Sequence, residues 1–115
     1  MHEVSLVDAL FDQADRAISP HPPTAVRQVT VRIGSLAGVE TELFRTAFEA
    51  CKGERGYAAA SLQIIEEKAA WRCAECGAVI QQGAALRCAS CDGQATLAAG
   101  GELILQRVEL EVSDV

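Results

Sequence analysis

The pattern of apolar and polar residues predicts an amphipathic helix at the start of the chain. Acidic residues occupy one side of residues 4–18, and apolar side chains recur at steps of three and four on the other. These apolar side chains are Val4, Val7, Phe11, Ala14 and Ile18. Prolines within residues 19–23 predict the end of the helix, because proline cannot donate the helical backbone hydrogen bond.

The two elements that follow differ in period. Residues 25–33 alternate between apolar and polar side chains, so we expect a strand with one buried face. From residue 40 to residue 51 the period of three to four returns, which predicts a second helix. The side chains expected to form its apolar face are Leu43, Ala47, Phe48 and Cys51.

Two further strands complete the predicted fold. Residues 62–67 form one, and residues 102–112 form a longer one whose first half could pair inside a separate small module. The second half of that strand could then return to the main sheet. We predict an α+β fold, with two helices packed on a small mixed three-stranded sheet and an inserted four-cysteine zinc-ribbon module. The expected domains are 1-69 with 101-115, and the inserted ribbon 70-100.

Four of the five cysteines lie in this insertion, in two Cys-x-x-Cys pairs with eleven residues between them. They are Cys73, Cys76, Cys88 and Cys91. Two residues between paired cysteines let a tight turn direct both sulfurs at one ion, and two such turns complete a tetrahedral zinc site. Gly77 and Gly93 follow the two pairs closely, and we expect both to reverse the chain with a positive φ.

Other chemistries use cysteines in the same spacing. Iron could occupy the same cage, and a disulfide pair or a thioredoxin-like redox centre also uses Cys-x-x-Cys. A redox centre needs one pair, which normally opens a helix, whereas two pairs are present here and no helical pattern follows either. A closed four-cysteine zinc site has no open position for catalysis. Structural zinc is therefore the preferred interpretation, and the chain is not expected to be an enzyme.

Composition narrows the class of protein. The 115 residues are 50% hydrophobic and 23% charged, as in an ordinary soluble globular protein. The sequence has no apolar run long enough to span a membrane and no secretory signal pattern, so we expect a cytoplasmic protein in which thiols stay reduced. A net charge of -6 disfavours nucleic acid, whose phosphates need basic partners. A zinc ribbon that binds nucleic acid or assists transcription is the alternative from another class.

His2 is the remaining candidate for chemistry. It follows Met1 directly, so the terminal amine, the imidazole and the backbone nitrogens between them could surround one metal ion. A planar set of nitrogens is the geometry that Ni(II) and Cu(II) prefer. Judged by itself, a histidine at a chain terminus is more often simply solvated.

Several segments spread along the chain belong to one recognisable pattern. They are the start Met1-His2-Glu3-Val4-Ser5-Leu6, the strand Val29–Gly34, the segment Val39–Phe44, the two cysteine pairs, and the closing segments Gly101–Leu105 and Val108–Val112. Together they resemble the HypA/HybF family of hydrogenase nickel-incorporation proteins. The resemblance covers essentially the whole chain.

This resemblance implies a nickel metallochaperone. Such a protein would receive Ni(II) as cargo and, with a GTPase partner of the HypB type, deliver it to the large subunit of [NiFe] hydrogenase; some family members also serve urease. By resemblance, Met1, His2 and Glu3 match the nickel-binding start, and the four paired cysteines match the structural Zn(II) ligands. We expect the GTPase to dock on the first helix, because that element adjoins the nickel site.

The chain departs from the family pattern at a few places. Thr41 stands where the family usually has proline, and Thr46 where it often has an aromatic residue. The eleven-residue spacer between the cysteine pairs is slightly short. These differences could change the start of the second helix or the tip of the ribbon, but none of them replaces a metal ligand.

Overall fold

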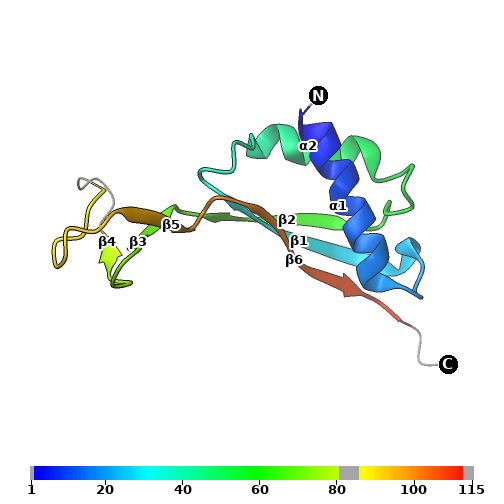
Figure 1. Cartoon of the computed structure of the whole chain (residues 1–115). Helices are drawn as coiled ribbons and strands as arrows, with labels where there is room; N and C mark the ends of the chain where they lie inside the picture. Colours follow the sequence, from blue (N-terminus) through cyan, green and yellow to red (C-terminus); the bar gives the residue numbers. More distant parts are fainter. Residues whose placement is uncertain (1, 81–85, 113–115) are drawn as a thin grey trace.

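The structure is a computed structural model that describes residues 2–80 and 86–112. The described elements are, in chain order, α1 (His2–Ile18), η1 (Pro23–Ala25), β1 (Val26–Gly34), α2 (Thr41–Cys51), β2 (Ser61–Glu67), β3 (Ala70–Cys73), β4 (Val79–Ile80), β5 (Ala95–Ala99) and β6 (Leu103–Leu110). The molecule is elongated, with extents of 59 × 34 × 17 Å. The two helices lie at one end and the small sheet that contains β3 lies at the other (Figure 1).

The strands form two separate three-stranded sheets. The first has the order β2-β1-β6, in which β1 is parallel to β2 and antiparallel to β6. Both helices cover the same face of this sheet, as Figure 1 shows from the side. The second sheet has the order β4-β3-β5 and is antiparallel throughout. The predicted α+β class, with two helices on a mixed three-stranded sheet and a second small cysteine-bearing sheet, is confirmed.

The core lies between the helices and the first sheet. Four residues of the predicted apolar face of α1 are buried there, namely Val7, Phe11, Ala14 and Ile18, whereas Val4 is 38% exposed. Phe11 stacks against Phe48 of α2 and against Tyr57. The predicted face of α2 is wrong in one position. Phe44 is fully buried, whereas Leu43 is 55% exposed. The two residues are adjacent apolar positions, so local periodicity could not decide which one faces the sheet.

The final strand also differs from its prediction. All of β6 pairs with β1, with Leu103 beside Ile33, Leu105 beside Val31 and Val108 beside Val29. The first half of this strand therefore does not pair inside the ribbon. The third strand of the ribbon is instead β5, which pairs with β3. Gly100 and Gly101, between β5 and β6, allow the chain to leave one sheet and enter the other.

The junction between the two sheets requires glycine at two positions. A Cβ on Gly34 would collide with the backbone of Gly100. Gly100 has a φ of 89°, and a Cβ there would lie 2.6 Å from the Cα of Ala69. Two backbone hydrogen bonds join the segments at this junction. Leu36 N donates to Gly100 O (2.8 Å), and Gly34 N donates to Glu102 O (2.9 Å). This close backbone packing fixes how the second sheet leaves the first.

A cluster of charges holds α1 against the segment that follows α2. Arg55 donates to Asp8 and Asp12, each at 2.7 Å, and to Asp15 at 3.2 Å, while its guanidinium lies 5.4 Å from the centre of the Phe11 ring. Tyr57, which is fully buried, donates its hydroxyl hydrogen to Asp15 at 2.6 Å. The acidic side of α1 is therefore occupied by an internal partner.

Within residues 2–80 and 86–112, no helix is both long and apolar enough to cross a membrane.

Candidate metal centre

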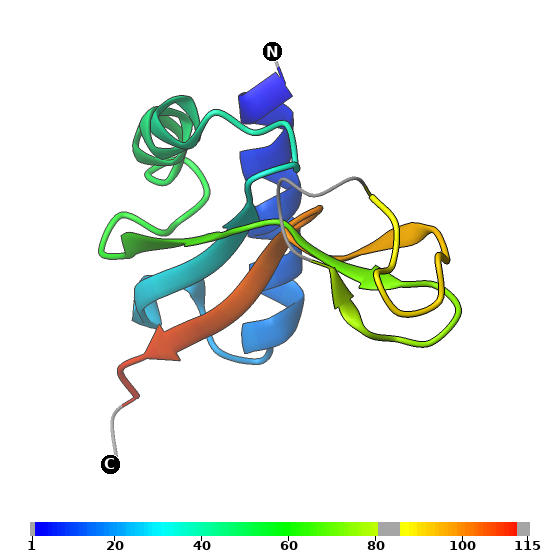
Figure 2. The same ribbon diagram turned by 90° about the vertical axis from the view of Figure 1, so that its left-hand side faces the viewer.

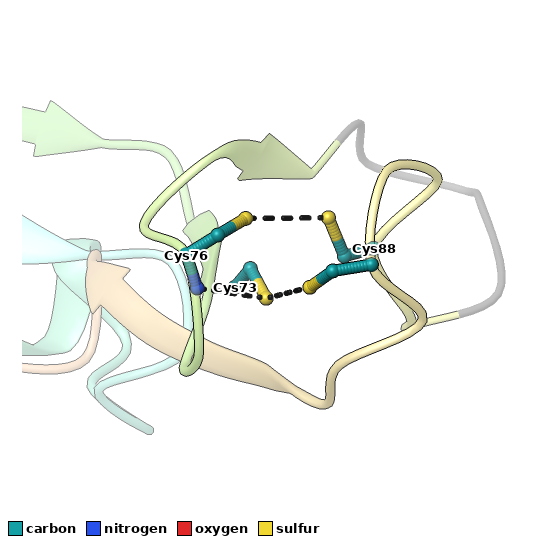
Figure 3. Close-up of side chains that lie close together, drawn as sticks. Cys73, Cys76 and Cys88 are labelled. Atoms are coloured by element: carbon teal, nitrogen blue, oxygen red, sulfur yellow. Dashed lines mark hydrogen bonds between the residues drawn. The ribbon is translucent and has the colours of Figure 1, made fainter.

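The four paired cysteines converge at the end of the second sheet. Their sulfur atoms all lie within 4.8 Å of one another, although they come from two segments of the chain. Cys73 is the last residue of β3, and Cys73 and Cys88 are buried, whereas Cys76 and Cys91 are exposed. Figure 3 shows the sulfurs of the two segments pointing toward a common centre.

The spacing of the sulfurs fits a tetrahedral ion. The Sγ atoms of Cys73 and Cys91 are 3.4 Å apart, and those of Cys76 and Cys88 are 3.7 Å apart. Four sulfurs placed tetrahedrally at the usual zinc–sulfur distance of about 2.3 Å would be about 3.8 Å apart. A disulfide needs about 2.05 Å between its sulfurs, and all five cysteines are free. The side chains are therefore arranged as a cage for one ion.

Backbone amides around the cage favour thiolates. The N–H groups of Glu75 and Cys76 point at Cys73 Sγ, at 3.4 and 3.5 Å, and the N–H of Ser90 points at Cys88 Sγ at 3.4 Å. The hydrogen bond from the Cys76 backbone, more than any other contact, lowers the pKa of Cys73 to about 6. The pKa of Cys88 is lowered in the same way, chiefly by the backbone of Cys91. Thiolate is the form that binds a metal.

One thiol in the cage has the opposite shift. The side-chain hydrogen bond with Cys73 is the largest cause that raises the pKa of Cys91, to about 12. Four negative sulfurs this close repel one another, so one of them keeps its proton unless a positive ion lies between them. The donor set therefore fits a divalent, thiophilic ion such as zinc better than it fits four free thiols.

The two turns that carry the cysteines are equivalent. In the first, Gly77 N donates to Cys73 O at 3.0 Å, and in the second, Asp92 N donates to Cys88 O at 2.9 Å. Gly77 has a φ of 77°, as expected, but the matching residue of the second turn is Asp92, with a φ of 60°. The expectation of a positive φ at Gly93 is wrong, because that residue lies one position beyond the reversal.

Gly93 is required for a different reason, which the sequence did not reveal. A Cβ at this position would lie 2.7 Å from Cys73 Sγ and 3.3 Å from Cys91 Sγ. The second turn therefore packs directly against two sulfurs of the cage. Only a residue without a side chain leaves room for this approach.

The predicted nickel-binding residues lie apart from the cysteines. His2 is the first residue of α1 and is exposed, and Glu3 is half-buried beside it. Met1 lies outside the described residues. His2 lines a groove with Gly101 and Glu102, at the junction between the two sheets, and does not belong to the cysteine cluster. The structure thus brings the four cysteines together and keeps His2 away from them.

A groove of about 470 Å³ runs along α1 from His2. On α1 it is lined by Leu6 and Gln13, and on the opposite wall by Val39 and Glu102. The opposite wall comes from the loop after β1 and from the start of β6, segments far from His2 in sequence. Sequence periodicity could not have placed these residues beside the terminus, because only the folded sheet brings them there.

The fold and the cysteine cage define a small α+β protein with a separate four-cysteine metal module. The sequence model of the HypA family, described as hydrogenase/urease nickel incorporation, metallochaperone, matches residues 1–110. The chain therefore belongs to the HypA family, whose members are metallochaperones and not enzymes. The family resemblance predicted from the sequence is confirmed.

Relatives match over nearly the whole chain. A hydrogenase maturation factor HypA of Shewanella halifaxensis is 34% identical over 113 residues, which are 96% of this chain and 98% of that protein. The corresponding factor of Wolinella succinogenes is 32% identical over 117 residues, 99% of this chain and 98% of that protein. The solution structure of the Ni metallochaperone HypA from Helicobacter pylori superimposes with a TM-score of 0.68 at 26% identity, covering 96% of this chain and 98% of that one.

Proposed function

We propose that this chain is a nickel metallochaperone of hydrogenase maturation that holds one structural zinc ion in its four-cysteine cage. The observation that supports zinc most directly is the cluster of four sulfurs within 4.8 Å. Residues 1–69 with 101–115 would form the nickel-binding domain, and residues 70–100 the zinc domain. Free thiols that bind metal suit a reducing compartment, which favours the cytoplasm.

The zinc proposal is tested by metal analysis of single variants. Cys73→Ala removes one of four ligands, and we expect the purified protein to lose its stoichiometric zinc while the helical circular dichroism persists. Cys51→Ala is the matched control, since Cys51 is half-buried against the helical core and distant from the cage. Stoichiometric zinc in Cys73→Ala would contradict the assignment.

Nickel, as cargo, is proposed to bind at the N-terminus through the Met1 amine, the His2 imidazole and nearby backbone nitrogens, with Glu3 orienting the site. The position of His2 at the start of α1 supports this. The first backbone N–H groups of a helix have no intrahelical acceptor, so their nitrogens can coordinate a metal without breaking a helical hydrogen bond. Exposure of His2 would let a partner protein reach the ion and remove it.

Nickel titration by calorimetry and absorbance tests the terminal site. Three proteins are compared: the native chain, His2→Ala, and a chain extended by a few residues before Met1. We expect both altered proteins to lose tight binding and the planar Ni(II) spectrum while they keep zinc. Affinity should fall as the pH falls, because protons compete with nickel for the nitrogen ligands. Native affinity in either altered protein would mean that nickel binds elsewhere.

The proposed partners are a HypB-type GTPase and the large subunit of [NiFe] hydrogenase. Donor and acceptor sites must meet for cargo to pass without escaping, which favours docking beside His2 on α1. Charge reversal at Asp8 or Asp12 would be a poor test of this docking, because both carboxylates are bound to Arg55. A change there would alter the fold as well as the surface.

Val4 offers a cleaner test, since it is 38% exposed and lies one helical turn from the terminus. We expect Val4→Asp to weaken GTPase binding in a pull-down or by calorimetry. Val112→Asp is the control, because Val112 is 53% exposed and follows β6 at the far end of the sheet. Equal binding by the two variants would place the GTPase on another face.

A further inference from the structure

Strand β6 forms an outer edge of the main sheet, with β1 on one side (Figure 2). The opposite edge, β2, is partly occupied by side chains from α2 and the residue after it. Lys52 donates to the carbonyl of Ala60 at 3.0 Å, and Arg45 donates to that of Leu62 at 3.5 Å. Among residues 2–80 and 86–112, no side chain donates to a backbone carbonyl of β6. An eight-residue edge of this kind is a template for another strand.

The hydrogen bonds at the two ends of β6 show which backbone N–H and C=O groups of this strand point away from β1. Glu102 accepts from Gly34 N, and Glu111 donates to Ala25 O, each at 2.9 Å, so both residues face β1. Backbone groups alternate along a strand. Counting inward from each end, the groups that point away from β1 belong to Leu103, Leu105, Val108 and Leu110.

The two counts meet in the middle of the strand. Here the register between β1 and β6 shifts by one residue, because Thr30 pairs with Arg107 while Val31 pairs with Leu105. Gln106 is the extra residue. As a result, the sequence of half-buried and exposed side chains along β6 is the same in both directions, with half-buried residues at the first, third, sixth and eighth positions. The edge is symmetric about the point between Gln106 and Arg107.

We propose that β6 pairs antiparallel with β6 of a second copy of this chain, about a two-fold axis between Gln106 and Arg107. Leu103 then lies opposite Leu110 of the second copy, and Leu105 opposite Val108. Each of these pairs joins two residues with outward backbone groups and half-buried apolar side chains, so backbone and side chains are matched together. Self-complementarity is what a two-fold contact requires.

The surface beside the edge fits the same partner. A groove of about 210 Å³ lies between α1 and β6, and its apolar lining includes Ala17, Ile18 and Val108. In the dimer, the same groove of the second copy would lie across the two-fold axis from this one. The pairing ends at Leu103 and Leu110, because the next pair would place Glu102 opposite Glu111, and like charges directly opposite are unfavourable. This limit coincides with the observed ends of β6.

The register makes a prediction that a charge at position 106 can test. Gln106 is exposed, and the pairing places it opposite Arg107 of the second copy, twice per dimer. Gln106→Arg puts two like charges opposite each other at both places, and Gln106→Glu puts opposite charges there. We expect the first variant to raise the dimer dissociation constant, and the second to lower it, each by about 2- to 30-fold.

Sedimentation equilibrium of the zinc-loaded full chain over a range of concentrations measures these constants. The double variant Gln106→Arg/Arg107→Gln exchanges the two side chains and restores a neutral pair across the axis, so we expect its dimer constant to return toward that of the native chain. A native chain that stays monomeric at millimolar concentration overturns the proposal, as does a dimer that is indifferent to Gln106→Arg. If the chain is monomeric and Gln106→Arg weakens binding of the GTPase, the edge belongs to that partner instead.

Discussion

Gly93→Ala is expected to weaken metal binding although it changes no ligand. The added Cβ would lie 2.7 Å from Cys73 Sγ, whereas ordinary contacts begin at 3.4 Å. To remove this clash, the sulfur or the turn must shift by about 0.7 Å. Metal–ligand distances vary by only about 0.2 Å in a well-formed site. Glu75, whose Cγ would lie 2.9 Å away, can move its flexible side chain, but the buried Cys73 cannot move without distorting the cage.

The size of the effect follows from the cost of overpacking, about 1–3 kcal/mol. If this cost appears entirely in the metal-bound state, zinc affinity should fall by about 5- to 150-fold. Competition with a chromophoric chelator at constant pH measures the change directly. Gly53→Ala is the matched control, because nothing lies within 4 Å of a Cβ there and its φ is not positive. Unchanged zinc affinity in Gly93→Ala would refute the proposed packing of the second turn against the sulfurs.

Three other predictions follow from the fold. Tyr57→Phe should cost about 2 kcal/mol in urea denaturation, because Asp15 loses a 2.6 Å hydrogen bond. Burial, and after it this hydrogen bond, raises the pKa of Tyr57 above its usual value of about 10. The stabilisation by the protonated hydroxyl is therefore complete below about pH 10 and decreases as the pH rises toward the raised pKa. The native chain should lose more stability than the variant between about pH 9 and pH 11. Gly100→Ala should lower the free energy of unfolding by about 2 kcal/mol or more, since a Cβ would lie 2.6 Å from Ala69 Cα and the φ is 89°. The thermal midpoint should fall accordingly, and an unchanged midpoint would show that the junction can relax. Chelation of zinc should abolish hydrogen-exchange protection in residues 70–80 and leave it intact in α1, and loss of protection in both would mean that the two sheets unfold together.

Local pattern alone was enough for the two helices, for β1, β2 and β6, and for the four cysteines of the cage, but it did not predict β3, β4 or β5. The steps of three and four in α1, the alternation in β1 and the paired spacing of the cysteines each depend on neighbours within a few residues, and such patterns are legible in a sequence. The cysteine cluster could be predicted although its two halves are distant in sequence, because two Cys-x-x-Cys turns can bind one ion only by coming together. The family resemblance used the same local segments.

The tertiary structure decided every feature that depends on which surfaces meet. Whether Leu43 or Phe44 is buried depends on how α2 turns against the sheet, since both are apolar. Which sheet receives residues 103–105 depends on the backbone contact at Gly34 and Gly100, which no local pattern encodes.

The same reason explains the contacts between distant segments. Arg55 binds three carboxylates of α1 that lie 40 to 47 positions away along the chain. The sequence indicated only that those carboxylates lie opposite the apolar face. Gly93 lies against Cys73 because the metal module folds two turns onto one centre. The sequence determines the period of each element and the residues that can bind metal, while packing in three dimensions determines which neighbours they have.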